Sequence, residues 1–444
     1  MFNLNRETEL TPDLLYKMIN KYHSNVLPKL QKYKNYYDGT QAILRKSYSD
    51  ASKPISRVVT NFCADIVSSY CGYIASPGYI SYSSDNDIDS IMDCLRYNDY
   101  QDEDSDFLNA ALIYGVAAEL MYTDEQGQVR FRLIEPTSCF GVYDDSLTGD
   151  LMYFVRWYKV NDWDNSDLYN VDVYSDTSIK HYQMHGTQGG LEFVSEEPHY
   201  FNQCPANIFY LDEDERSIFD CIITLQDAYN ELLSGEIDDF SAFCDAYLML
   251  EGVDAEEEDI ASMKANRVLI LPSGATANWL TKNASDTQIE NILKRVHDNI
   301  YRIAKCPDFS SETFVGGVSS GVAIRYRLTG CETKAAAIES NMKKALQRRI
   351  ELIAGVASLK LGEDIFRDIQ ITFKRNIPED YTSIVNIVNA LKGTVSDETL
   401  LSMIPQVTDV KAELERVEKQ KQKNIELYGF GGTGADDDEE DENS

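Results

Sequence analysis

Residues 115–134, GVAAELMYTDEQGQVRFRLI, mark the point at which the chain changes from helix to strand. Before them, at about residues 102–112, apolar side chains recur at helical spacing between acidic positions. From Gly115 onward apolar and polar residues alternate, and the turn sequence DEQG at residues 124–127 predicts a β-hairpin. Runs of strand character follow at 139–144, 151–160, 169–175 and 179–185. The sequence therefore predicts an α+β fold with a substantial sheet.

Helices are expected on both sides of this strand-rich region. Thr11 followed by Pro12 is typical of an N-cap and first turn, and predicts a helix toward Tyr37. A second helix is expected at about residues 54–69. After a strand-like stretch at 369–375, Ser396 and Thr408 have the character of caps for two helices that reach about residue 428. Residues 429–444 are strongly acidic and poor in apolar side chains, which predicts a disordered tail.

Two segments, 212–243 and 286–306, have apolar residues at near-heptad spacing, which predicts two helices that pack side by side. The insert between them, residues 244–285, includes the acidic patch 256–259 and the strand-like RVLILP at 267–272. We therefore expect a small α/β unit carried on a two-helix stalk. The residues predicted to pack the stalk are Ile218, Ile222, Leu225, Tyr229, Ile292, Val296 and Ile300.

A glycine-rich loop separates the second stalk helix from a long helical segment. Pro307 opens the loop, and Gly316, Gly317 and Gly321 lie near its end. The helix that follows has a regular apolar stripe from Ile338 to Ile353, with a bend or junction expected at Gly330. Residues 316–321, GGVSSG, lack the spacing GxxxxGK[ST] of a phosphate-binding loop, so we expect a flexible loop and no nucleotide.

The chain is strongly acidic. It contains 41 lysine and arginine residues against 74 aspartate and glutamate residues, a formal net charge of -33. The run at 436–442 supplies only a small part of this charge, so the acidity belongs to the whole fold. A protein that grips nucleic acid through phosphate contacts needs lysine and arginine. The charge therefore argues against tight DNA binding over the whole surface.

The spacing of the cysteines and the length of the apolar stretches indicate in which compartment the protein is found. The nine cysteines include no CxxC pair, which favours reduced thiols in a cytoplasm over a zinc site. The first residues, MFNLNRETEL, do not have the pattern of a signal peptide. Residues 108–122 form the most apolar long stretch, but Asn109 and Glu119 interrupt it. We expect a protein without membrane attachment.

No catalytic motif stands out. His181 and His185 would converge on a metal only in a helix, and their surroundings, SIKHYQMH, predict a strand. Carboxylates are so numerous that a suitable acid and base pair carries no information. No G-x-S-x-G elbow, HExxH helix or Cys/His signature is present. We therefore expect neither enzymatic activity nor a cofactor.

Three motifs, in order, resemble the portal proteins of long-tailed, headful-packaging phages of Gram-positive bacteria. The first is YKNYYDG at 33–39 with SRVVTNF at 56–62 and CGY at 71–73. The second is AALIYGVA at 110–117, followed by the predicted hairpin and LIEP at 133–136. The third is SSGVAI at 319–324, which opens the long helix. The resemblance covers about residues 10–395.

The resemblance implies a ring of twelve subunits around a channel. It implies a wing at 1–211 and 320–395, stem helices at 212–243 and 286–306, a clip at 244–285, a tunnel loop at 307–319 and a helical crown at 396–428. The loop residues that would line the channel are Asp308, Ser310, Ser311, Glu312, Thr313, Phe314, Val315, Gly316, Gly317 and Ser319. The clip residues that would dock a partner are Glu256, Glu257, Glu258 and Asp259.

The same resemblance implies a set of partners and a location. The partners would be the terminase large subunit, a head-completion or adaptor protein, the major capsid and scaffolding proteins, and double-stranded DNA that passes without sequence-specific binding. The ring would be assembled in the host cytoplasm and reside at the portal vertex of the virion. Two other classes stay open, namely a different assembly protein such as a scaffold or adaptor, and an acidic enzyme of unknown type.

Overall fold

The computed structural model describes residues 2–47, 55–160, 167–186, 189–243, 248–251, 274–279, 286–308, 321–357, 365–375, 381–404, 407 and 410–428. The chain divides into two compact units, Met1–Asn376 and Ile377–Ser444, and each is described by itself. The division precedes residue 396, at which we expected the C-terminal helices to begin. Helices and strands are both abundant, so the predicted α+β class is confirmed.

The first unit contains most of the elements. Its helices are α1 (Pro12–Asn25), α2 (Leu27–Tyr37), α3 (Phe62–Ile74), α4 (Asp89–Tyr97), α5 (Tyr100–Tyr114), α6 (Ile223–Phe243), α8 (Asp286–Ala304) and α10 (Gly321–Ala357), with short 3-10 turns η1 (Ala42–Arg45), η2 (Pro136–Ser138), η3 (Asp220–Ile222) and η4 (Ile365–Asp368). The second unit contains α11 (Tyr381–Leu391), α12 (Asp397–Ser402) and α13 (Val410–Tyr428).

Four sheets organise the strands of the first unit. The largest has the order β1-β5-β6-β7-β8-β9, and a three-stranded sheet has the order β10-β3-β4. The pairs β11-β12 and β13-β2 form two smaller sheets. The bounds are β1 (Phe2–Leu4), β2 (Ile80–Ser83), β3 (Val116–Thr123), β4 (Val129–Ile134), β5 (Cys139–Asp144), β6 (Leu151–Lys159), β7 (Leu168–Tyr174), β8 (Ser178–His185), β9 (Leu191–Pro198), β10 (Ala206–Tyr210), β11 (Leu248–Glu251), β12 (Thr276–Trp279) and β13 (Gln370–Phe373).

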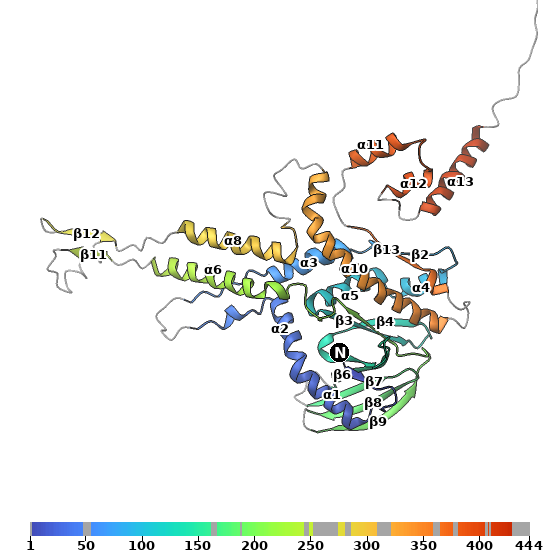
Figure 1. Cartoon of the computed structure of the whole chain (residues 1–444), viewed down its shortest axis with the longest axis horizontal. Coiled ribbons are helices and arrows are strands. Elements are labelled where there is room, and N and C mark those ends of the chain that lie inside the picture. Colours follow the sequence, from blue (N-terminus) through green and yellow to red (C-terminus); the bar gives the residue numbers. More distant parts are fainter. Residues whose placement is uncertain are drawn as a thin grey trace, which may run out of the picture. The chain divides into compact units, whose positions relative to one another are not determined.

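The two larger sheets face each other, and helices cover their outer faces (Figure 1). A Cβ at Gly141 in β5 would lie 2.6 Å from the terminal methyl group of Ile208 in β10, so a larger residue there would require this side chain to shift. On the other face of the three-stranded sheet, Arg349 of α10 contacts Glu119 of β3. The aromatic ring of Tyr22 in α1 stacks on Phe140 of the six-stranded sheet.

The hairpin predicted at residues 115–134 is confirmed as β3 and β4, in which Thr123 pairs with Val129. The Asp124 carboxylate accepts hydrogen bonds from the backbone amides of Gln126 and Gln128, which closes the turn. Gly115, just before the hairpin, has φ of +81°, and a Cβ there would lie 2.5 Å from the backbone of Glu215. Glycine is therefore required at the junction between α5 and β3.

Several predicted helix boundaries were wrong. The helix expected from Pro12 to Tyr37 is two helices, because Val26 ends α1 and α2 has proline in its first turn. The helix expected at 54–69 begins only at Phe62, after the N-cap Asn61. No junction divides α10 at Gly330. Ser396 caps α12 as predicted, whereas Thr408 lies outside the described residues.

A buried charge cluster joins α10, α5 and the three-stranded sheet. The Arg349 guanidinium is fully buried and forms ion pairs with Asp104 and Glu119. Tyr82 donates a hydrogen bond of 2.8 Å to Asp104, and Asn207 donates one of 2.9 Å to Glu119. Burial raises the pKa of Asp104, although the positive charge of Arg349 opposes this. One cation therefore satisfies two carboxylates at the centre of the unit.

We predict that Arg349→Met destabilises the chain by about 3–5 kcal/mol, because it leaves two buried carboxylates without a counter-charge. Asp104→Asn should cost about 1 kcal/mol or less, since the amide oxygen can still accept from Arg349, the amide nitrogen can donate to the Tyr82 hydroxyl, and the change removes a charge that burial already disfavours. Urea unfolding of the two variants and the parent chain measures the difference. Equal losses of unfolding free energy in the two variants would show that the charge of Arg349 is not what stabilises the cluster.

Candidate functional site: a two-helix arm and its attachment

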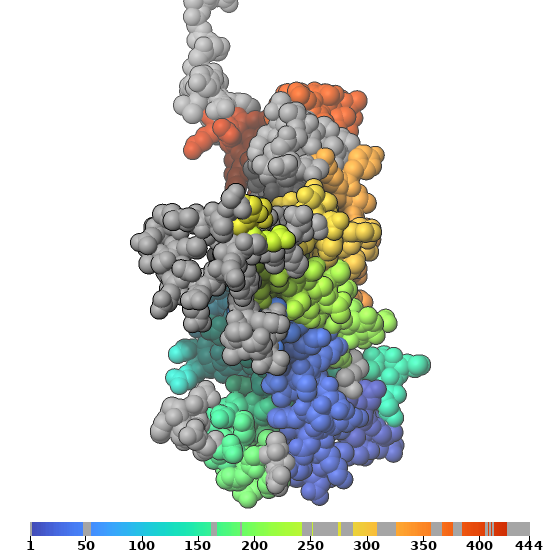
Figure 2. Space-filling view, turned by 90° about the vertical axis from the view of Figure 1, so that its left-hand side faces the viewer, coloured from blue at the N-terminus to red at the C-terminus, as the bar shows by residue number. Residues whose placement is uncertain are grey.

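The helices α6 and α8 pack side by side, and we call this pair the arm (Figures 1 and 2). The strands β11 and β12 lie between them in the sequence and pair antiparallel, with Leu248 opposite Trp279. The rest of the insert at 244–285, including the acidic patch 256–259 and the run at 267–272, lies outside the described residues. The structure thus describes a two-helix arm with a hairpin in its insert.

The predicted stalk residues differ in burial. The first helix begins at Ile223 and not near residue 212, because residues 211–219 form a turn and residues 220–222 a 3-10 helix. Ile218 therefore precedes the arm, although it is buried. Ile222 and Ile300 are fully buried, whereas Ile292 is 48% exposed. Leu225, Tyr229 and Val296 are half-buried.

Residues 55–61 run along α6 and lead into Phe62, the first residue of α3, and we call residues 55–62 the strap. The backbone amides of alternate strap residues each donate to a side chain of α6, at distances of 2.5 to 3.1 Å. The pairs are Ser56 with Asp238, Val58 with Ser234, Thr60 with Asn230, and Phe62 with Gln226. All four α6 side chains are buried. The strap is therefore attached to α6 like a strand to a sheet edge, with side chains replacing the partner backbone.

Matched repeats make this attachment possible. Four residues of α-helix rise about 6 Å, and two residues of extended chain rise about 6.6 Å. Over the three intervals between the four pairs, the two repeats diverge by only about 2 Å. Acceptors at every fourth position of a helix can therefore serve donors at every second position of an extended segment. Further bonds join Asn230 to Gln41 and Gln226 to the carbonyl of Thr60.

The strap ends at the seam between the two arm helices. The ring of Phe62 lies 5.0 Å from that of Tyr229 on α6, and 5.5 Å and 5.9 Å from those of His297 and Tyr301 on α8. Tyr301 also donates a hydrogen bond of 2.8 Å to Asp65, on the helix that continues from the strap. Phe62 thus contacts both helices and holds them at a fixed separation.

Two side chains cap the C-terminal end of α8. The Tyr70 hydroxyl donates to the carbonyls of Ala304 and Lys305, at 3.1 and 3.0 Å. The ammonium of Lys334 on α10 donates to the carbonyls of Ala304 and Ile218, at 3.5 and 3.2 Å. A cation at a helix C-terminus also interacts favourably with the helix dipole. Lys334 therefore links the long helix α10 to the base of both arm helices.

Apolar side chains remain exposed along the arm. Phe240 is 71% exposed, Ile292 48%, Ile303 43% and Ile237 38%. Two of these lie on each helix, so the exposed apolar surface belongs to both. Scattered apolar residues are common on protein surfaces, but four of them on one narrow pair of helices form a surface suited to burial in an assembly.

Most of the remaining predicted site residues lie outside the part of the chain that the structure describes. Of the loop at 307–319, only Pro307 and Asp308 are described; a carboxylate oxygen of Asp308 lies 3.8 Å from Nε2 of His297 at the arm seam. The residues Ser310, Ser311, Glu312, Thr313, Phe314, Val315, Gly316, Gly317 and Ser319 lie outside the described part, as do Glu256, Glu257, Glu258 and Asp259. His181 is on a strand, as predicted, and its Nδ1 lies 2.7 Å from Asp172.

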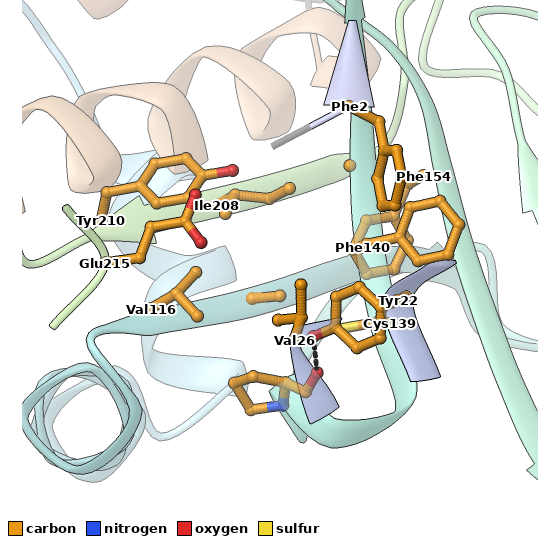
Figure 3. A pocket seen from close by; sticks show the side chains of 13 residues that line it. Phe2, Tyr22, Val26, Val116, Cys139, Phe140, Phe154, Ile208, Tyr210 and Glu215 are labelled. Carbon is orange, nitrogen blue, oxygen red and sulfur yellow. Dashed lines mark hydrogen bonds between the residues drawn. The ribbon is translucent and has the colours of Figure 1, made fainter. Parts of the chain in front are cut away.

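A small, partly open apolar pocket of about 40 Å³ lies between the two larger sheets (Figure 3). Phe2, Phe140 and Phe154 line one side of it, and the Tyr22 hydroxyl donates to the carbonyl of Pro136. The cavity has room for one or two water molecules at most, so it is a packing defect and not a ligand site. Within the described residues, no cluster of three or more potential metal ligands is found. Among the described helices, none has the length and apolar character needed to span a bilayer.

The chain matches a known protein family over most of its length. A family model described as "Phage portal protein, SPP1 Gp6-like" matches residues 16–427. The chain belongs to this phage portal protein family. A curated relative, the portal protein of Bacillus phage SPP1, is 23% identical over 397 residues, which cover 82% of this chain and 76% of the relative. The family resemblance inferred from the three sequence motifs is confirmed.

Two of the portal-like motifs acquire physical explanations. The motif at 56–62 is the strap, and Phe62 inserts into the arm seam. The motif at 110–117 contains Gly115, which the close approach of Glu215 requires. In the motif at 33–39, the hydroxyls of Tyr33 and Tyr36 donate to Asp220 and Asp227 at the base of α6. These portal-like residues therefore fix the arm to the body of the first unit.

We missed the four α6 side chains that hold the strap. Gln226, Asn230, Ser234 and Asp238 recur at intervals of four, and this polar stripe beside the apolar one was a detectable signal. Such a stripe is usually taken as a solvent-facing surface. Its short uncharged members, and its location in a helix already expected to pack, could have indicated a buried polar contact.

We predict that Asn230→Ala lowers the free energy of unfolding by about 2–3 kcal/mol, because it leaves the Thr60 amide and the side-chain oxygen of Gln41 without their partner. Thr224→Ala, on an exposed face of the same helix, should change it by less than about 0.5 kcal/mol. Chemical unfolding followed by circular dichroism measures both. A small loss for Asn230→Ala would mean that the strap is not held by these bonds.

A second pair of variants separates burial within the subunit from burial between subunits. Ile300→Asp should cost several kcal/mol, because it places an unpaired charge in the arm seam. Ile292→Asp should cost less than about 1 kcal/mol in the isolated chain, since this side chain is already half exposed. Thermal unfolding of the separated subunit is the measurement. Similar losses for both would place Ile292 in the subunit core.

Proposed function

We propose that the chain forms a ring-shaped channel at one vertex of a phage capsid, through which double-stranded DNA enters during packaging and leaves during ejection. The observation that carries this proposal is the arm, which is attached by many specific bonds at its base yet exposes apolar residues along its length. Such an element is suited to packing against copies of itself. Membership in the portal family gives the ring as the natural assembly, with about twelve copies expected from the resemblance.

In this proposal the arm is the stem of the ring, and residues 244–285 are the clip. The clip would dock the terminase large subunit during packaging and a head-completion or adaptor protein afterwards, with the acidic patch 256–259 as the contact. The major capsid and scaffolding proteins would surround the wing. Residues 307–319 would line the channel, and residues 396–428, which include α12 and α13, would form the crown. The assembled ring would reside in the virion after assembly in the host cytoplasm.

The charge of the chain supports a channel through which DNA slides. Each phosphate that a protein neutralises adds about 0.9 to the salt dependence of binding to duplex DNA, so many cations in the channel would slow translocation. A chain with 74 acidic and 41 basic residues presents few such contacts. We therefore expect DNA to pass without sequence-specific binding and without turnover of a substrate by this chain.

A scaffold or adaptor protein of the same phage is the alternative. Negatively stained particles of the purified chain separate the two, because a portal should give rings with a central channel. The sharper test uses Phe240→Ser and Ile292→Ser, which remove exposed apolar groups from both arm helices. We predict monomers that fold normally but do not close into rings, as judged by circular dichroism and electron microscopy.

Asn291→Ser is the matched control, because it changes an exposed polar residue of α8 next to Ile292. It should leave ring formation intact. Rings that form equally well in the Phe240 and Ile292 variants would remove the arm from the subunit interface. A parent chain that forms no ring under any assembly condition would argue for the scaffold or adaptor class.

A further inference from the structure

A groove of about 520 Å³ runs beside β10, between α10 and the six-stranded sheet. One wall is a single face of α10, made of Asn341, Lys344, Ala345 and Arg348. The other wall includes Tyr143 and Leu151 of the six-stranded sheet. Between the walls lies β10 itself, which is the outer strand of its sheet. We call this feature the β10 groove.

The register shows which backbone groups of β10 face the groove. The Met121 amide donates to the carbonyl of Pro205, and the Leu211 amide donates to the carbonyl of Gly115. At both ends of β10, the backbone groups of odd-numbered residues therefore point toward β3. Because backbone direction alternates along a strand, Asn207 and Phe209 face β3 as well. The amide and carbonyl groups of Ile208 and Tyr210 therefore point away from β3, toward the open edge.

The helix wall satisfies the backbone at both ends of this edge but not in its middle. Arg348 donates to the carbonyl of Cys204 at 3.5 Å, and Asn341 donates to the carbonyl of Leu211 at 3.2 Å. Between these caps, no backbone hydrogen bond to the described part of the chain is found for the outward groups of Ile208 and Tyr210. A stretch of strand edge is thus left ready to pair.

Other outer strands of the two larger sheets are protected against pairing. The strand β9 has a bulge opposite His181 and Tyr182 and carries Glu192, Glu196 and Glu197. The strand β1 is only three residues long, and β4 carries Arg130 and Arg132. Bulges, charges and short length are the devices that keep sheet edges from joining other chains. The strand β10, with the sequence ANIFY, has no charged residue and no bulge, and with five residues it is longer than β1. Its edge is therefore not protected in any of these ways.

Two charges define what could enter the groove. Lys344 is exposed on the helix wall, and no ion pair with another described residue is found for it. Glu213, on the lip that follows β10, is likewise exposed and forms no ion pair within the described part. An occupant that pairs with both needs an acidic side chain near the middle of the groove and a basic one near the Glu213 end.

No described strand of a second copy of this chain meets that requirement. Among the outer strands, β9 has three glutamates and no cation, β11 has one glutamate and no cation, and β4 has two arginines and no acid. The other outer strands, β1, β2, β10, β12 and β13, have no charged residue. The helices cannot supply an open strand edge. The charge pattern therefore favours a segment from a different protein.

We propose that an extended segment of a different protein in the phage particle binds in the β10 groove as an added strand, pairs with the outward backbone groups of Ile208 and Tyr210, and places a carboxylate against Lys344. Strand addition gives affinity through main-chain bonds and specificity through side chains at alternate positions. The inference rests on the proposed portal function, because it needs the chain to be built into a particle.

Amide hydrogen exchange resolved to single residues tests the pairing. In the isolated chain, the amides of Ile208 and Tyr210 should exchange at least about tenfold faster than those of Asn207 and Phe209, which bond to β3. In particles that contain the assembled ring, the exchange of Ile208 and Tyr210 should slow by about tenfold or more. Unchanged exchange at these two amides in particles with intact rings overturns the proposal but leaves the ring function standing.

A photo-cross-linking residue introduced at Leu151, on the sheet wall, identifies the occupant by mass spectrometry. Cross-links to an extended, mixed-charge segment of another particle protein support the proposal, and cross-links only to copies of this chain overturn it. Lys344→Glu should reduce the cross-linked fraction about fivefold, whereas Lys294→Glu, a charge reversal on exposed α8 outside the groove, should not. Equal effects of both reversals would remove Lys344 from the contact. Particles without rings would instead count against the proposed function.

Discussion

The attachment of the strap to α6 is the interaction on which the rest of the arm depends. Four buried side chains at every fourth position of α6 receive four backbone amides from alternate residues of the strap. The strap leads directly into α3, and Phe62 at its end contacts both arm helices. An isolated pair of amphipathic helices gains little stability in water. The arm is therefore held in place by polar bonds along one side of α6, which leaves its exposed apolar residues available for other contacts.

Many carboxylates of this acidic chain accept hydrogen bonds from tyrosine hydroxyls. At least seven tyrosine hydroxyls donate to carboxylates, in the pairs Tyr33 with Asp220, Tyr36 with Asp227, Tyr73 with Glu332, Tyr82 with Asp104, Tyr97 with Asp124, Tyr114 with Glu135 and Tyr301 with Asp65. Burial and the neighbouring carboxylate both raise the pKa of Tyr33, Tyr36 and Tyr301, so these hydroxyls remain donors. A neutral donor satisfies a carboxylate without cancelling its charge. The fold can thus be well bonded while the surface stays negative.

The sequence predicted those elements whose signal is local. The change of period at Gly115, the turn at Asp124 and the cap at Thr11 depend on neighbouring residues, and each was found where expected. Contacts between distant segments were not predictable. Arg349 meets carboxylates that lie 230 and 245 positions away, and nothing in its own helix separates it from Arg348, which is half-buried. The start of α6 was misplaced because Ile218 and Ile222 have helical spacing, although one lies in a turn. The strand β9 was missed because none of its residues is fully buried, so its sequence has no alternation to detect.

Some residues of the arm and its surroundings are buried and bonded within the subunit, whereas others remain exposed and available for contacts in an assembly. Four amides of the strap and the carbonyl groups at the end of α8 have partners, and Ile222 and Ile300 are fully buried. Farther along, Phe240 and Ile292 are exposed, and the edge of β10 is open between two capped ends. A subunit that must fold alone before it joins a larger structure needs this division, because surfaces left for later contacts cannot contribute to its own stability. The open edge and the exposed arm residues lie on different elements, so one can serve copies of the chain while the other serves a different partner.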